Sequence, residues 1–157
     1  MWPSEWPSSA RAIATAIEAA VTAARAADES GFDAATADLA ELPDDQVTTV
    51  LAAIVRELLE IAHPDGLTGD DVRAVLESVV RRAAPWLPRL DAAAVFSALA
   101  GALGIDEEAE PDRVRTSPQP AAVLLIDYLA DLSRTPPDHV VQRAINEIAR
   151  AETVEMP

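Results

Sequence analysis

Apolar residues recur along this chain three and four positions apart, in six or seven separate stretches, which is the spacing of amphipathic helices. The widest apolar face lies between Asp44 and Ala62 and consists of Val47, Val50, Leu51, Ile54, Val55, Leu58 and Leu59. A face this wide predicts a helix at the centre of the fold. No stretch alternates apolar and polar residues as a half-buried strand does. We therefore expect an all-α protein.

Proline, glycine and capping residues mark the ends of the predicted helices. Gly31 is expected to follow the first helix as its C′ residue, and Gly104 to end the fifth. Thr68 and Asp91 are suited to cap the fourth and fifth helices at their N-termini. The helices are expected at about residues 8–29, 33–41, 44–62, 68–84, 91–104, 120–133 and 135–151.

The whole chain, residues 1–157, is predicted to form one compact domain, a bundle or array of six to seven helices joined by short links punctuated by proline. Residues 1–9 are expected to form an extended arm, 106–119 an acidic, proline-rich loop, and 152–157 a tail. No charged residue lies between Asp91 and Asp106, so the fifth helix should be buried on most sides, with Phe96 inside. Leu132 is expected to be buried in the sixth helix.

The balance of charge narrows the classes of partner. There are 27 acidic and 12 basic residues, which gives a net charge of −15. This charge repels phosphate backbones and anionic lipid, so neither nucleic acid nor a membrane is an expected partner. It also helps to keep an alanine-rich helical protein in solution.

Other features of the composition concern source and compartment. All 12 basic residues are Arg, a usage typical of a GC-rich bacterial genome. The absence of Cys excludes disulfides and thiolate-held metals. The longest uncharged stretch, 92–105, is shorter than the ~20 residues of a membrane helix, and the start of the chain lacks a signal-peptide pattern. A cytoplasmic protein is the prediction.

The most unusual segment is the Trp-Pro-Ser near-repeat that contains Trp2 and Trp6. Tryptophan is costly to leave in water and is enriched at the centres of protein interfaces. A proline-rich arm with two indoles is suited to dock into a groove between helices. That groove could belong to the same chain, to a second copy in a homodimer, or to another protein. A second candidate surface for a protein partner is the acidic run Asp106, Glu107, Glu108 and Glu110.

One basic cluster could bind an anion. Arg81, Arg82 and Arg89 surround Trp86, and guanidinium groups beside an indole suit a planar anion or a nucleotide. Against this, Arg81 follows Glu77 by four positions, which is typical of a solvent-exposed helix face with paired charges.

No catalytic or cofactor motif is complete in this sequence. Glu60 and His63 have the Glu-x-x-His spacing of di-iron helices, but the pair occurs once and Pro64 follows it. Asp65–Asp71 resembles a calcium loop at first sight, yet Leu67 and Leu76 occupy positions where an EF-hand has ligands. Nucleophile elbows and phosphate-binding glycine loops are absent. No metal, cofactor or catalytic residue is predicted.

These observations favour a non-enzymatic protein-interaction or regulatory module. One alternative is a small-molecule or anion-binding protein, or an enzyme, with a pocket between helices formed by His63, Tyr128 and the arginine cluster. Another alternative is an acidic mimic that binds a basic partner surface. Binding of that kind should weaken as salt rises from about 50 to 200 mM.

Overall fold

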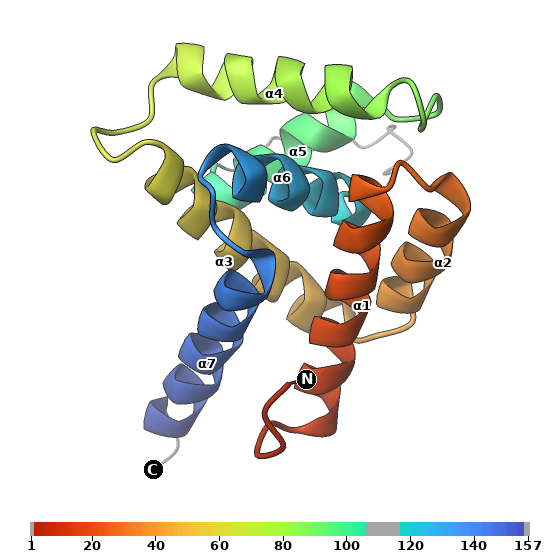
Figure 1. Cartoon of the computed structure of the whole chain (residues 1–157). Coiled ribbons are helices and arrows are strands. Elements are labelled where there is room, and N and C mark those ends of the chain that lie inside the picture. Colours follow the sequence, from red (N-terminus) through yellow and green to blue (C-terminus); the bar gives the residue numbers. More distant parts are fainter. Residues whose placement is uncertain (1, 106–116, 156–157) are drawn as a thin grey trace, which may run out of the picture.

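Seven α-helices make up the computed structural model, which describes residues 2–105 and 117–155 and side chains up to residue 150 (Figure 1). No strand occurs in these ranges, so the prediction of an all-helical fold with six to seven helices is confirmed. The helices are α1 (Ser8–Arg25), α2 (Glu29–Ala40), α3 (Asp44–Ala62), α4 (Gly69–Ala83), α5 (Ala92–Leu103), α6 (Gln119–Leu132) and α7 (Pro137–Glu155).

The centre of the fold is α6, which packs against all six other helices. Every residue from Ala121 to Asp127 is buried, because this helix is apolar nearly all round. The expectation that α3 is central was wrong. Although α3 buries its wide apolar face against α5, α6 and α7, it keeps an exposed polar face that includes Arg56 and Glu60.

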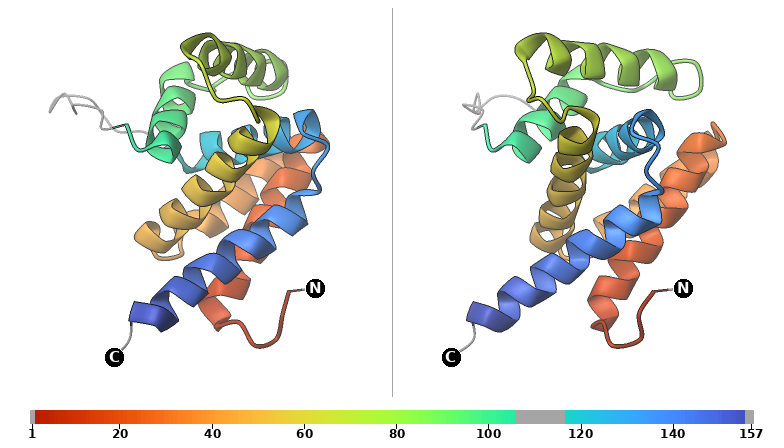
Figure 2. Two further views of the ribbon diagram at one scale, coloured as in Figure 1. Left: turned by 90° about the vertical axis from the view of Figure 1, so that its left-hand side faces the viewer. Right: turned by 60° about the vertical axis from the view of Figure 1, so that its left-hand side comes forward.

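The helices form an irregular array and not a set of parallel rods. Figures 1 and 2 show α1 and α2 side by side at one edge, α4 running across one end, and α7 crossing the opposite end. Within the described ranges, no helix is both long enough and apolar enough to cross a membrane.

The link between α1 and α2 differs from the prediction. Gly31 is not the residue that follows α1; it lies in the first turn of α2. Ala27 takes the left-handed conformation instead, with φ of 54°, and Asp28 caps α2 by accepting a hydrogen bond of 3.0 Å from the Gly31 backbone nitrogen. Since Asp is a strong N-cap residue, α2 begins at Glu29 and not at Asp33.

Three other predicted helix ends, at Thr68, Asp91 and Gly104, are confirmed. Thr68 and Asp71 form a reciprocal capping box at the start of α4, and Asp91 caps α5. Gly104 ends α5 with φ of 74°, a conformation that favours glycine. The expected tail from Glu152 is incorrect as far as Glu155, because α7 continues to that residue.

Two apolar side chains that were expected inside lie at the surface. Phe96 is 46% exposed and Leu132 is 51% exposed. The buried stripe of α5 runs through Val95, Ala98 and Leu99, which leaves Phe96 to one side of the stripe. This uncharged helix is therefore enclosed on only part of its surface, and Ala92, Ala93, Phe96 and Gly101 are exposed.

Candidate functional site

A groove of about 810 Å³ lies along the outer face of α1, between the N-terminal arm and the end of α2. Trp2 of the arm forms one wall, and Asp38, Glu41 and Leu42 form another. The α1 side of the groove is a single stripe of residues at helical spacing, namely Ser8, Arg11, Ala12, Thr15, Ala16, Glu18 and Ala19. The groove thus follows α1 for about 17 Å, at 1.5 Å per residue.

The floor of the groove consists largely of small side chains, because α1 has alanines on both of its faces. Ile13, Ile17 and Val21 are turned inward, and the helix packs against α2, α6 and α7. The stripe of Ala12, Thr15 and Ala19 faces outward and lines the groove. Short side chains let the backbone of a ligand approach α1 closely.

The arm is fixed to its own chain through Trp6. This indole is only 6% exposed, and its Nε1 donates a hydrogen bond of 2.9 Å to Oδ1 of Asn146 on α7. Trp2 stacks on Trp6, with ring centroids 5.8 Å apart and planes 15° from parallel. A backbone hydrogen bond from Trp6 to the carbonyl of Pro3 closes the turn between them. Of the three docking modes considered for the arm, the structure shows contact with its own helices.

The indole nitrogen of Trp2 differs from that of Trp6. Trp2 is half-buried, and its Nε1–H is shielded from water yet has no acceptor among the described residues. A buried donor without a partner costs about 1–3 kcal/mol. The wall that Trp2 supplies to the groove is therefore held by ring stacking and not by a polar contact.

The rim of the groove is acidic. Glu18, Asp38 and Glu41 line it and are exposed, with Arg11 as the basic residue among them. None of these three carboxylates forms an ion pair with a described residue. The segment that contains Asp38 and Glu41 is acidic as a whole, because residues 26–55 contain no basic residue and seven acidic ones, of which Asp33 pairs with Arg89.

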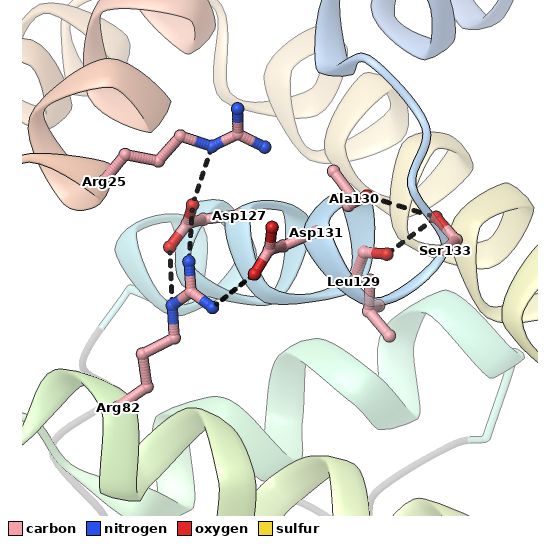
Figure 3. Close-up of polar contacts among 7 residues, drawn as sticks. All are labelled: Arg25, Arg82, Asp127, Leu129, Ala130, Asp131 and Ser133. Carbon is pink, nitrogen blue, oxygen red and sulfur yellow. Dashed lines mark hydrogen bonds and ion pairs between the residues drawn. The ribbon is translucent and has the colours of Figure 1, made fainter.

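A second polar feature is buried at the centre of the array. Asp127 of α6 is 3% exposed and accepts hydrogen bonds from Nε of Arg25 on α1 at 3.1 Å and from Nη2 of Arg82 on α4 at 3.4 Å (Figure 3). The Nε atom of Arg82 also lies 3.3 Å from the carboxylate as an ion pair. Arg82 also reaches Asp131, one turn further along α6, at 3.0 Å. Three helices are joined at this carboxylate.

Burial raises the pKa of the Asp127 carboxyl above its ordinary value, and the guanidinium groups of Arg82 and Arg25 oppose that rise. Burial outweighs the two guanidinium groups because both arginine side chains remain in contact with water, at 42% exposure for Arg25 and 39% for Arg82. Solvent screens their charge, while the carboxylate itself is desolvated. We interpret the cluster as a structural junction.

This junction was not predicted from the sequence, although the sequence holds one signal for it. Asp127 follows Val123 by four positions and Leu124 by three, so it lies on the apolar stripe of α6. A charged residue on a buried stripe requires partners. The sequence does not indicate which arginines supply them, because Arg25 and Arg82 are distant along the chain.

Three of the four residues predicted to bind an anion, Arg82, Trp86 and Arg89, contact other side chains of the protein. Arg82 is directed to Asp127, and Arg89 pairs with Asp33 of α2. Trp86 is half-buried and meets Phe32 edge-on, with ring centroids 5.3 Å apart. Arg81 is exposed on α4.

The remaining candidates do not come together around a cavity. His63 ends α3, with its Nδ1 3.0 Å from the carbonyl oxygen of Leu59, and neither His63 nor Tyr128 lines the groove. The acidic run Asp106, Glu107, Glu108 and Glu110 lies outside the described residues. Over the ranges that are described, no group of three or more His, Cys, Asp or Glu side chains could hold a metal ion.

A smaller hollow of about 90 Å³ lies where α3, α5 and α6 meet. Its lining includes Ala52, Ala98, Gly101 and Ala122, and it is mostly apolar. This volume is well below the roughly 300–1,000 Å³ of sites for drug-sized ligands.

Comparison of the chain with protein-family models, with curated proteins and with solved structures finds no match. A function for this chain must therefore be inferred from the groove and its chemistry.

Proposed function

We propose that this protein is a non-enzymatic interaction module, and that another protein docks in the groove along α1. The observation that carries the proposal is the groove itself, about 810 Å³ in volume, with a floor of mostly small residues and a tryptophan wall. Tryptophan beside a small-residue floor suits a protein interface, because an indole supplies a large contact area and small residues allow close packing.

The small-molecule alternative has less support. The apolar hollow between α3, α5 and α6 is too small for a typical ligand, and Arg82 and Arg89 are engaged with carboxylates. The groove along α1 is large enough, but it is open to solvent, and its charged residues Arg11, Glu18, Asp38 and Glu41 are exposed, so water screens their contacts with a small molecule.

The test fills the groove without touching the core. Ala19 is exposed on α1 and lines the groove, so Ala19→Phe places a ring in the docking site. Ala74 is exposed on α4, outside that groove, so Ala74→Phe is the matched control. Tagged wild type and both variants are used to capture proteins from cells of the source organism. Each captured protein is identified by mass spectrometry, purified and titrated calorimetrically.

A partner that binds wild type and Ala74→Phe but binds Ala19→Phe at least about tenfold more weakly would support the proposal. Circular dichroism must show that both variants keep their helix content. A partner that binds all three proteins equally would place the interface elsewhere and overturn the assignment of the groove. Catalytic turnover of a small molecule by the purified protein would overturn the non-enzymatic part.

A further inference from the structure

The groove has a shape and a charge that together specify a class of partner, and this inference rests on the proposed function. We propose that the groove binds a basic, amphipathic helix of a partner protein, about three turns long, with its apolar side on the alanine floor and its Arg or Lys side chains on the acidic rim.

The charge of the rim favours a cationic partner. Glu18, Asp38 and Glu41 stand around the groove without ion-pair partners among the described residues. Arg11 alone brings positive charge to the lining. Unpaired carboxylates at a rim attract a cationic ligand and steer it during approach. A basic helix would bring two or three charges to this rim.

The floor of the groove offers only a few hydrogen-bonding groups to the backbone of a ligand, namely the side chains of Ser8, Arg11, Thr15 and Glu18 on α1. A peptide that binds in extended form gains its main-chain hydrogen bonds from a sheet edge, and no strand occurs among the described residues. The methyl groups of Ala12, Ala16 and Ala19 donate and accept nothing. The scattered polar side chains cannot pair every backbone group of an extended peptide, so the groove favours a peptide that satisfies its own backbone groups, which a helix does.

The length of the groove suits a short helix. The groove follows α1 from Ser8 to Ala19, a length of about 17 Å, which matches roughly three helical turns. Small residues along this stripe permit helix axes to approach closely. Trp2 closes one end as an apolar wall, and its unpaired indole N–H is a donor that a small shift of the arm would present to a carbonyl or side-chain oxygen of the partner.

The experiment uses synthetic peptides of about 12 residues as probes, since three turns fill the groove. The basic peptide has Leu and Ala on one face and Arg on its flanks. A neutral peptide has Gln in place of every Arg, and an acidic one has Glu. A fourth peptide keeps the arginines but has Pro at its centre, which prevents a continuous helix. Binding is measured by calorimetry at about 50 and 200 mM salt, where screening differs, and mapped by amide chemical shifts.

Two variants of the full chain remove the same total charge from different places. The rim variant is Glu18→Gln/Asp38→Asn/Glu41→Gln, which leaves the shape of the groove intact. The control variant is Glu60→Gln/Asp65→Asn/Glu77→Gln, at exposed positions of α3, α4 and their link that do not line the groove. Both variants have the same net charge, so a difference between them reports the location of the charges.

We expect the basic peptide to bind wild type and the control variant alike, and the rim variant about tenfold more weakly, since each exposed pair contributes a few-fold. Binding should weaken with salt, shifts should cluster on α1 and the end of α2, and the Pro, Gln and Glu peptides should bind poorly.

Three other results would overturn the inference. Equal weakening by both variants would mean diffuse attraction to an acidic surface. Binding of all the peptides at the groove, abolished by Ala19→Phe, would reject the basic helix and leave the docking function standing. Binding of none would also reject the basic helix, and the captured-partner test with Ala19→Phe would then decide the proposed function by itself.

Discussion

The indole nitrogen of Trp6 donates a hydrogen bond of 2.9 Å to the side-chain oxygen of Asn146, 140 positions further along the chain. This contact joins the N-terminal arm to the last helix and holds the stacked Trp2 ring at the groove. The arm is thus part of the folded core at Trp6 and part of the candidate binding surface at Trp2.

Replacing Asn146 with Ala is expected to lower the free energy of unfolding by about 1–2 kcal/mol. The change removes the acceptor of the Trp6 Nε1–H in a part-buried contact, and a donor left without its partner costs about 1–3 kcal/mol, less where water can replace the acceptor. Urea unfolding followed by circular dichroism measures the effect. Gln142, exposed one turn earlier on α7, provides the control, and Gln142→Ala should change stability by less than about 0.5 kcal/mol. Equal effects would contradict a special role for the Trp6–Asn146 contact.

The two tryptophans should respond differently to loss of the indole N–H. Trp2→Phe removes a buried donor that has no partner, which relieves the cost of burying it. This relief offsets the loss of ring area, so the free energy of unfolding should change by less than about 0.5 kcal/mol. Trp6→Phe removes a satisfied donor and buried area, and should cost about 1–3 kcal/mol. Thermal unfolding of both variants under one buffer condition makes the comparison. A Trp2→Phe protein as unstable as Trp6→Phe would disprove the difference in pairing.

Local chemistry predicted most of the helices. The bounds of α3, the caps Thr68 and Asp91 and the left-handed Gly104 follow from propensity and capping, which depend on neighbouring residues. The end of α1 could not be placed correctly because two signals competed. Gly31 is a good C′ residue, but the Asp28 cap of α2 begins the next helix earlier.

Relationships between distant residues could not be predicted from the sequence. The central position of α6 depends on which helices surround it, and the groove depends on where the end of α2 meets the stripe of α1. Trp2 was a candidate from its residue type alone, whereas the alanines and the rim carboxylates are common residues with no distinguishing spacing. Only the folded arrangement gives Glu18, Asp38 and Glu41 a common location.

Asp127 should give stability a pH dependence of defined sign. Because burial raises its pKa above the ordinary value of 3.8, the folded protein binds this proton more tightly than the unfolded chain does. The carboxyl's contribution to stability is therefore complete below that ordinary value and is lost as pH rises through the raised pKa. Relative to Asp127→Asn, which does not ionise, wild type should lose unfolding free energy as pH rises through this window.

Direct titration of the Asp127 carboxyl carbon by NMR checks the same point. The midpoint should lie above 3.8 in wild type. In Arg82→Gln it should move higher still, since the guanidinium that opposes the effect of burial is gone. A wild-type midpoint at or below 3.8 would show that the two arginines outweigh desolvation.

The glycine inside α5 and the glycine that follows it should respond oppositely to the same substitution. A methyl group added at Gly101 would meet nothing within 4 Å, and the residue lies inside the helix. Gly101→Ala should therefore raise the free energy of unfolding by about 0.5–1 kcal/mol, because alanine favours the helical conformation. Gly104 has a φ of 74°, which alanine adopts only with strain. Gly104→Ala should therefore lower the free energy of unfolding by about 1 kcal/mol. Urea unfolding of both variants, with m compared to wild type, measures the two changes. Shifts in the same direction would contradict the backbone conformations assigned to the two positions.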